Sequence, residues 1–574
     1  MNTLVIVLIS VVVLGVGYTL YGRHIAKKWG IDPKAETPAV KYNDGKDYVP
    51  TNGWTVFSHQ FSSIAGAGPV TGAIQAAVFG WLPVLLWILI GGVFFGAVTD
   101  FGALYASVKN QGKSMGMLIE KYIGKLGRKL FTIFCWLFSL LIIAVFADMV
   151  SGTFNAFDAA SGAKLAAAGA NGSAGMVSIM FMVFAVIFGL IQKKFNFSGW
   201  KEFLLGVVFI VASFAIGIKC PIVLGKDGWS YVVFAYIFVA AVVPIWLMKQ
   251  PRDYMTTIMF VCMILGAAVG LIIGHPTMNL PVFTGFTNEK LGTMFPILFV
   301  TVACGAVSGF HSLVSSGTSS KTIANEKDML KVGYGAMILE SVLAVLALCV
   351  AGAAAAKNGT PADGTPFQIF SRGVAGFFEK MGMPVNVATV FMTMCVSALA
   401  LTTLDAVARI GKMSFQEIFS VDDMQHAKPW RKVLCNPYFA TIITLLCGFV
   451  LTKIGYEKVW PLFGSANQLL SALVLITLCV FLKVTGRSNK MLFPPMIIML
   501  CVTFTALVQR VIALVKAISA GTDVFGSALQ LVVAVLLITL GLIIVVNSFK
   551  SYLKSKKGSE VAEVSAESKE PADA

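Results

Sequence analysis

The chain has 574 residues, of which 57% are hydrophobic and only 13% are charged. This composition excludes an ordinary soluble globular protein and indicates an all-α polytopic membrane protein. The formal net charge of +16 would favour nucleic-acid binding in a soluble protein. Here the basic residues lie between apolar segments, as they do in the cytoplasmic loops of membrane proteins, so we expect the lipid bilayer and no nucleic acid as a partner.

Fifteen segments approach the length of about 20 residues that a helix needs to cross a bilayer. In chain order they cover residues 3–21, 54–79, 81–108, 130–152, 175–192, 200–219, 229–248, 254–274, 294–318, 330–355, 385–411, 437–455, 459–483, 491–516 and 526–548. Segment 3–21 has basic residues after it and none before it, which is the wrong polarity for a cleaved signal peptide. We therefore expect a retained first helix with the N-terminus outside.

The distribution of lysine and arginine tests this count. With the N-terminus outside, every predicted inner loop carries basic residues, and most of the chain's basic residues fall on the cytoplasmic side. The C-terminus is then cytoplasmic. Residues 549–574 are charged and poor in large apolar residues, so we expect a disordered cytoplasmic tail there.

Two of the apolar segments contain glycine-rich interruptions, at residues 64–72 and 303–312. A break in a membrane helix exposes backbone groups that need partners, so it persists only inside protein or beside a polar cavity. Broken helices in both halves of a chain point to a transporter substrate site near the middle of the membrane. The alternative is that the glycines only allow helices to pack closely.

The two predicted broken helices run in opposite directions, and each begins a set of five spans. This parity predicts an inverted repeat with five plus five helices. We divide the chain into an extra N-terminal helix and cytoplasmic loop, a first repeat, two inserted helices, a second repeat, two C-terminal helices and the tail, at residues 1–53, 54–219, 220–293, 294–483, 484–548 and 549–574.

Several blocks resemble the carbon starvation protein A family of bacterial membrane proteins. They are IAGAGP at 64–69, WLP at 81–83, GAVTDF at 96–101, PIWLMKQPRDY at 244–254, ACGAVSGFHSLVSSG at 303–317, LTTLDAVAR at 401–409 and WPLFGSANQLL at 460–470. The resemblance extends over nearly the whole chain. It implies uptake of peptides or, in some members, pyruvate during nutrient limitation, a place in the bacterial cytoplasmic membrane, and a core like that of the amino acid–polyamine–cation superfamily.

The two breaks supply the candidate substrate-binding residues. Half-helix N-termini in them would favour an anionic group such as a carboxylate, and nearby polar side chains would line the same cavity. The candidates are Gly66, Ala67, Gly68, Pro69, Thr71, Gln75, Gly305, Ala306, Ser308, Gly309, Ser312 and Ser315.

Ionisable and hydroxyl side chains within the spans are the candidates for ion coupling, because such groups are costly in a membrane. They are His59, His311, Glu340, Asp100, Asp405, Ser397, Thr402 and Thr403. Histidine and buried carboxylates suit a proton, and the family resemblance favours a proton as well. The hydroxyls Ser397, Thr402 and Thr403 would suit Na⁺, as in sodium-coupled relatives of the superfamily.

Two of these candidates have a further interpretation. Asp405 has Arg409 four residues later, so a helix-stapling ion pair is the alternative for it. His59 and His311 are the residues that a metal site would use, although the chain has no recognisable metal-binding motif.

We interpret the chain as a secondary active transporter that imports short peptides or a small carboxylate such as pyruvate, coupled to a proton. It has no phosphate-binding glycine–lysine motif, zinc-protease motif or nucleophile elbow, so we expect neither an enzyme nor a cofactor. The alternatives are a sodium-coupled amino-acid carrier and a starvation sensor or channel without active transport.

Overall fold

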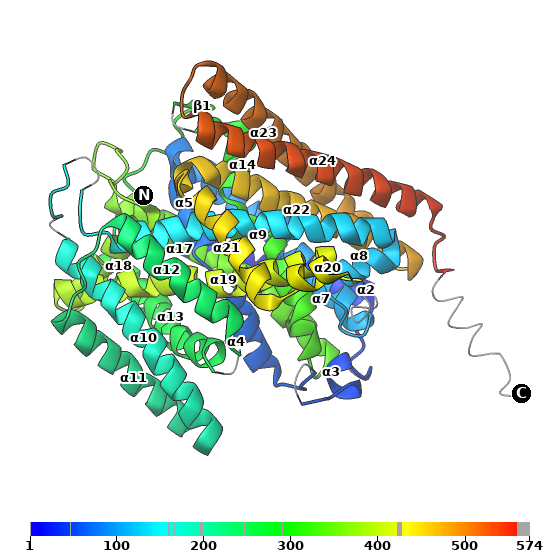
Figure 1. The fold of residues 1–574 in the computed structure, drawn as a ribbon, viewed down its shortest axis with the longest axis horizontal. Helices are drawn as coiled ribbons and strands as arrows, with labels where there is room; N and C mark the ends of the chain where they lie inside the picture. The colour runs from blue at the N-terminus through cyan, green and yellow to red at the C-terminus, as the bar shows by residue number, and fades with distance from the viewer. Residues whose placement is uncertain are drawn as a thin grey trace, which may run out of the picture.

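A computed structural model describes residues 2–45, 48–158, 161–165, 167–195, 199–244, 247–289, 291–421 and 428–559. Within these residues the protein is almost entirely helical (Figure 1). The sheet found there has two antiparallel strands, β1 (Thr287–Asn288) and β2 (Gly292–Thr293), with Thr287 opposite Thr293. The prediction of an all-α protein is confirmed.

The first half of the chain carries the following helices. They are α1 (Thr3–Val16), η1 (Gly17–Gly22), α2 (Arg23–Trp29), α3 (Pro38–Lys41), α4 (Gly53–Ile64), α5 (Gly68–Ala76), η2 (Ala77–Phe79), α6 (Trp81–Gly91), η3 (Gly92–Gly96), α7 (Ala97–Lys109), α8 (Met115–Ile123), α9 (Lys125–Phe154), α10 (Ala168–Phe195), α11 (Trp200–Lys219), α12 (Lys226–Val242) and α13 (Lys249–Gly274).

The second half continues in the same way. Its helices are α14 (Met294–Thr301), α15 (Ala303–Ala306), α16 (Gly309–Gly317), η4 (Ser319–Lys321), η5 (Glu326–Asp328), η6 (Leu330–Gly335), α17 (Ala336–Ala354), α18 (Pro366–Lys380), α19 (Val385–Phe419), α20 (Pro429–Leu434), α21 (Pro437–Thr452), α22 (Tyr456–Val484), η7 (Lys490–Leu492), α23 (Phe493–Ser519) and α24 (Val524–Lys554).

Eleven helices in the described residues are long and apolar enough to cross a membrane. Each falls on one of the fifteen predicted segments. The remaining segments contain the shorter helices α12 and α21 and the two interrupted helices. The chain is therefore a multi-pass membrane protein.

Helix α18 was not among the predicted segments. It is amphipathic and carries Arg372 and Glu379, so its sequence does not look like a membrane span. Its start is stabilised by a capping box, in which Thr365 Oγ1 accepts from the Gln368 amide at 3.3 Å and Gln368 Oε1 accepts from the Thr365 amide at 3.0 Å. The helix covers α19 and α13.

The first predicted break is present. Helix α4 ends at Ile64, because Ala65 leaves helical geometry at ψ 63°, and α5 begins at Gly68. Pro69 follows at the start of α5, where a missing amide hydrogen costs nothing. The second break is also present: Val307 and Ser308 are extended between α15 and α16.

The packing around the two breaks is reciprocal. Helix α5 packs on α17, and α16 packs on α7, while α9 and α19 lie along each other. An inverted repeat would produce this exchange of partners. Helix α12 packs on α9, α19 and α21, and α10 packs on α11, α19 and α13, with α11 at one edge of the molecule (Figure 1). The division into repeats stays a prediction.

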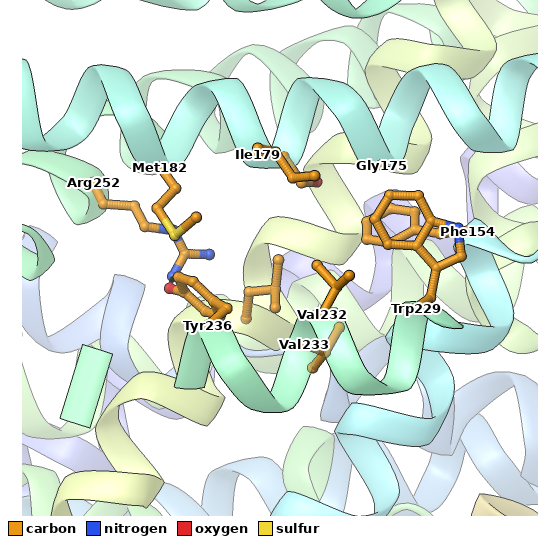
Figure 2. A pocket seen from close by; sticks show the side chains of 11 residues that line it. Phe154, Gly175, Ile179, Met182, Trp229, Val232, Val233, Tyr236 and Arg252 are labelled. Carbon is orange, nitrogen blue, oxygen red and sulfur yellow. Dashed lines mark hydrogen bonds between the residues drawn. The ribbon is translucent and has the colours of Figure 1, made fainter. Parts of the chain in front are cut away.

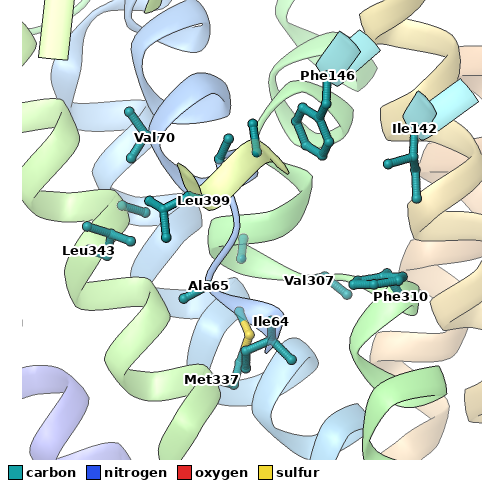
Figure 3. Packing of buried hydrophobic residues seen from close by; sticks show 14 of the residues in the cluster. Ile64, Ala65, Val70, Ile142, Phe146, Val307, Phe310, Met337, Leu343 and Leu399 are labelled. Atoms are coloured by element: carbon teal, nitrogen blue, oxygen red, sulfur yellow. The ribbon is translucent and has the colours of Figure 1, made fainter. Parts of the chain in front are cut away.

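Apolar side chains fill the space between the two breaks. Figure 3 shows Ile64 and Ala65 from the first break near Val307 and Phe310 from the second, with Phe146 of α9 above them. All five are buried. In this conformation the interior between the broken helices is therefore closed by hydrophobic packing.

Candidate functional site

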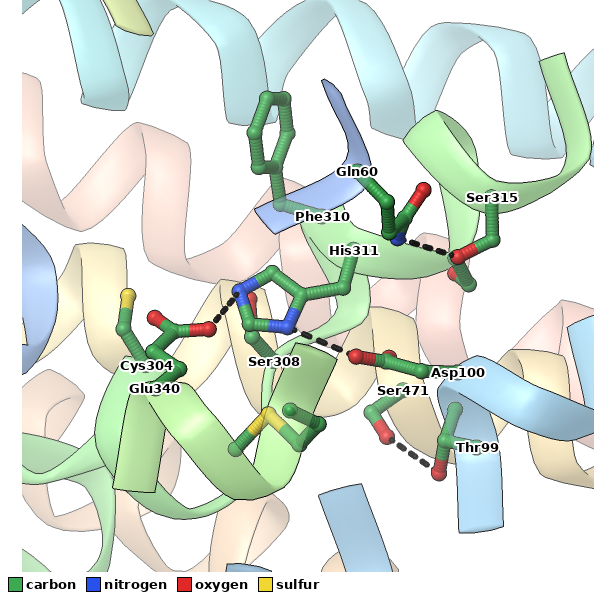
Figure 4. A network of polar contacts seen from close by, with 12 residues as sticks. Gln60, Thr99, Asp100, Cys304, Ser308, Phe310, His311, Ser315, Glu340 and Ser471 are labelled. Carbon is green, nitrogen blue, oxygen red and sulfur yellow. Dashed lines mark hydrogen bonds and ion pairs between the residues drawn. The ribbon is translucent and has the colours of Figure 1, made fainter. Parts of the chain in front are cut away.

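The imidazole of His311 lies between two carboxylates in the interior of the protein (Figure 4). His311 is in the first turn of α16, directly after the second break. Its Nδ1 is 3.0 Å from Oδ2 of Asp100 on α7, and its Nε2 is 3.2 Å from Oε2 of Glu340 on α17. The exposed fraction of His311 is 1%, and Asp100 and Glu340 are fully buried. The structure thus brings together three of the residues predicted for ion coupling.

The cluster has spare hydrogen-bonding capacity. The 3.2 Å contact between Glu340 and His311 is an ion-pair distance without hydrogen-bond geometry, so both oxygens of Glu340 lack a hydrogen bond within the described residues. Among the same residues, Asp100 Oδ1 also lacks a hydrogen bond. Buried carboxylates without partners are costly as anions. An imidazole between two of them can take up a proton and pass it on through its two nitrogens.

Asn467 of α22 occupies the N-terminus of the half-helix that carries His311. Its Oδ1 accepts from the Phe310 amide at 3.1 Å and from the Ser308 hydroxyl at 3.2 Å. Its Nδ2 donates to Ser308 Oγ at 3.1 Å and to Cys304 Sγ at 3.5 Å. This residue was missed from the sequence, although a polar Asn467–Gln468 pair inside an apolar span is a signal of function or of buried hydrogen bonding.

The side chain of Gln60 on α4 forms hydrogen bonds at the C-terminal end of α16. Its Nε2 donates to Ser315 Oγ at 2.8 Å, and its Oε1 accepts from Ser319 Oγ at 2.5 Å. Gln60 is fully buried and was also missed. The predicted Ser312 instead donates to the backbone oxygen of Gly309 at 2.6 Å. Ser315 therefore belongs to a link between the two broken helices, whereas Ser312 bonds within its own helix.

The glycines of the breaks also serve close packing. A methyl group added at Gly66 would meet the hydroxyl of Thr403, and one at Gly68 would meet the side chain of Cys304. Gly305 faces Ala344 in the same way, and Gly309 faces the backbone of α22. Ala67, Pro69 and Ala306 are buried beside them. These glycines therefore lie at the helix breaks and also allow neighbouring helices to pack closely.

The remaining predicted polar residues are spread around the first break. The hydroxyls of Thr71, Ser397 and Thr402 are buried and have no hydrogen-bond partner in the described part of the chain, and Thr403 Oγ1 donates to the Leu399 oxygen at 3.1 Å. Gln75 is half-buried. Their roles stay predictions.

A metal site gains no support. The described residues contain no group of three or more His, Cys, Asp or Glu side chains placed to hold a metal ion. His59 is half-buried on α4, whereas His311 is enclosed by Asp100 and Glu340.

Asp405 belongs to a second, separate ionic cluster. Its Oδ2 accepts from the Tyr236 hydroxyl of α12 at 2.5 Å and from Nη1 of Arg252 on α13. The expected i, i+4 pair with Arg409 is absent: Arg409 Nη2 instead donates to the backbone oxygens of Ala240 and Val243, the latter at 2.7 Å. The two residues are neighbours on α19, but tertiary partners from α12 and α13 compete for both.

Known bacterial transporters resemble this chain in sequence over most of its length. The family described as carbon starvation protein CstA matches residues 2–358 and 352–506. The chain belongs to this family. Among curated members, the pyruvate/proton symporter BtsT of Escherichia coli K12 is 31% identical, over 88% of this chain and 81% of its own length.

Two further members of the CstA family show how far the similarity extends. The peptide transporter CstA of Escherichia coli K12 is 30% identical over 84% of this chain and 77% of its own length. The peptide transporter CstA of Bacillus subtilis 168 is 29% identical over 97% of this chain and 98% of its own. A solved structure, the manganese transporter of Eremococcus coleocola, aligns at a TM-score of 0.48 and 11% identity, over 89% of this chain and 99% of that one.

Proposed function

We propose that this protein is a secondary active transporter of the bacterial cytoplasmic membrane that imports a small carboxylate such as pyruvate, or a short peptide, together with a proton. The names of its relatives, a pyruvate/proton symporter and peptide transporters, support the substrate classes and the proton. The observation that carries the proposal is the buried His311 between Asp100 and Glu340, at the start of a broken half-helix. The N-terminus is outside and the C-terminus cytoplasmic.

In this proposal, proton binding is linked to helix movement through His311. Asp100 and Glu340 come from the continuous helices α7 and α17, whereas His311 comes from the short half-helix α16. A protonated imidazole is attracted by both carboxylates, and a neutral one is attracted far less. Loss or gain of the proton therefore changes how strongly α16 is held against α7 and α17.

Substrate binds between the breaks in this proposal. Gly66 to Pro69 on one side and Gly305 to Gly309 on the other offer backbone groups near the middle of the membrane. In the described conformation apolar side chains close this space, and Asn467 occupies the α16 N-terminus. Substrate entry then requires the broken helices to separate from α9 and α19, which is the movement of alternating access.

Uptake into proteoliposomes tests the proposal. An inward proton gradient should accelerate uptake of labelled pyruvate or a labelled dipeptide, with saturation at high substrate concentration. His311→Gln should lose the acceleration, because glutamine cannot carry the proton. His24→Gln is the matched control, since His24 is exposed on α2.

The alternatives predict other results. If only a sodium gradient accelerated uptake, ion coupling would be assigned to the hydroxyls around Gly66, and the proposed role of His311 would be contradicted. Flux that never saturates would indicate a channel. Competition of unlabelled peptides and 2-oxo acids against the labelled substrate then identifies the substrate class.

A further inference from the structure

The N-terminus of the half-helix α16 is occupied by a side chain from another span. Asn467 of α22 is fully buried, and its Oδ1 accepts from the Phe310 amide at 3.1 Å and from the Ser308 hydroxyl at 3.2 Å. Helix α16 approaches α22 closely at this point, since a methyl group at Gly309 would meet the backbone of Asn467 and Ser471. A carboxamide thus fills the position at the end of α16 where an anion would bind.

One carboxamide leaves this N-terminus incompletely satisfied. Among the described residues, the buried amides of Gly309 and His311 have no hydrogen-bond partner. Asn467 offers one acceptor oxygen, whereas a carboxylate offers two oxygens and a negative charge. Buried amides without partners are costly, and the partial positive charge of a helix N-terminus favours an anion over a neutral group. The end of α16 therefore matches a carboxylate better than it matches the side chain that occupies it.

Glu340 lies on the other side of this group of residues. Figure 4 shows its carboxyl group beside Cys304 and Ser308, the two residues that accept hydrogen bonds from Nδ2 of Asn467. Its two oxygens have no hydrogen-bond partner in the described part of the chain. As an anion Glu340 would repel a carboxylate at the α16 N-terminus, whereas a protonated Glu340 can donate a hydrogen bond to it. A proton held by Glu340 or His311 therefore favours a carboxylate at this position.

We propose that Asn467 is an internal stand-in for the carboxylate of the substrate, and that a bound carboxylate displaces its side chain from the N-terminus of α16. This inference rests on the proposed function, in which pyruvate and short peptides share a carboxylate. One carboxylate oxygen takes the place of Asn467 Oδ1 on the Phe310 amide, and the other accepts from the amides of Gly309 and His311. Neutral molecules of the same size gain little from the helix dipole, so the competition with Asn467 selects for anions.

Small-molecule rescue of Asn467→Ala in the purified full-length protein tests the proposal. Formate and formamide both have the size of the carboxamide that this variant removes, and only formate is an anion. At equal ionic strength, formate should raise the thermal midpoint of Asn467→Ala more than formamide does. It should leave the midpoint of Ser465→Ala unchanged, since Ser465 donates only to the Pro461 oxygen of its own helix. A formate effect no larger than that of formamide would refute the proposal.

The affinity for pyruvate is a readout that a purely structural role of Asn467 would not change in the expected direction. The pyruvate concentration that gives half of the maximal thermal shift should be severalfold lower in Asn467→Ala than in the native protein, because no internal group competes for the site. Weaker or unchanged binding in the variant would contradict displacement. Unchanged binding is the result that a site elsewhere would give, such as the cavity between α10 and α12, which Asn467 does not line (Figure 2).

A second variant covers the case in which Asn467→Ala does not fold. Asn467→Asp has nearly the same size and places a carboxylate of the protein at the α16 N-terminus. It should abolish the thermal shift that pyruvate or dialanine produces, and an unchanged shift would refute the proposal. If neither compound shifts the native protein, the proposed substrate classes are wrong, whereas the comparison of formate with formamide still decides the role of Asn467.

Discussion

Asn467 Oδ1 lies 3.1 Å from the amide nitrogen of Phe310 and so caps the half-helix α16 from a neighbouring span. Its side chain takes part in four hydrogen bonds, all to residues 304–310. The break in the second helix is therefore stabilised by a side chain distant in sequence.

Asn467→Ala should lower stability by about 1–3 kcal/mol, because it leaves a buried amide and a buried hydroxyl without partners. It should also reduce transport, since α16 carries His311. The thermal midpoint of the purified protein and uptake in proteoliposomes measure the two effects. Ser465→Ala is the control on α22, because Ser465 donates only within its own helix, to the Pro461 oxygen. Equal losses of stability and transport in Asn467→Ala and Ser465→Ala would contradict a specific role of Asn467 in capping α16.

Gly68→Ala should destabilise the protein by about 1–3 kcal/mol, as overpacking of a core does, because the new methyl group meets the Cys304 side chain. Cys304→Gly removes that obstacle. The same Gly68→Ala change should therefore cost much less in a Cys304→Gly background. Thermal midpoints of the single and double variants measure the energetic coupling between positions 68 and 304. Additive losses would show that the backbone conformation, not the contact with Cys304, requires glycine at position 68.

Asp405→Asn should be strongly destabilising, by about 3–5 kcal/mol, because it leaves the buried Arg252 without its anionic partner. Replacing both partners by apolar residues, Asp405→Leu with Arg252→Met, should be milder for the same reason. Thermal midpoints again provide the measurement. Arg409→Gln should cost less than Asp405→Asn, since Arg409 donates to backbone oxygens instead of pairing with Asp405. A larger loss of stability in Arg409→Gln than in Asp405→Asn would instead support the i, i+4 pair between Asp405 and Arg409 that was inferred from the sequence.

The predicted orientation can be tested by cysteine labelling. A cysteine at Lys164 should react with an impermeant thiol reagent in intact cells, and one at Lys113 should not, because the predicted topology places the first outside and the second inside. Both belong in a Cys220→Ser background, since Cys220 is exposed and is placed on the outer side by the same topology. Labelling of the cysteine at position 113 but not of the one at position 164 would show that the membrane orientation is the reverse of the predicted one.

Local composition predicted the breaks but not their partners. Gly66, Gly68 and Pro69 in sequence indicate an interrupted helix wherever the segment lies in the fold. The contacts of His311 with Asp100 and Glu340 join three helices, so no spacing in the sequence specifies them. The titratable residues could be named individually, while their grouping depends on tertiary packing.

Two other differences have physical causes. Asp405 and Arg409 are close on one helix, and a pair between them seemed sufficient from sequence alone. Arg252 takes the carboxylate instead, because α13 brings its guanidinium into the same buried space. Helix α18 was missed since its amphipathic sequence carries charges that a spanning helix avoids, although its capping box is readable.

Proton flux is the most direct test of whether His311 couples proton movement to substrate uptake. Proteoliposomes containing a trapped pH-sensitive dye and no imposed gradient should acidify inside when substrate is added outside. His24→Gln should acidify like the native protein, whereas His311→Gln should not. Substrate uptake without acidification by the native protein, or unchanged acidification in His311→Gln, would contradict the account.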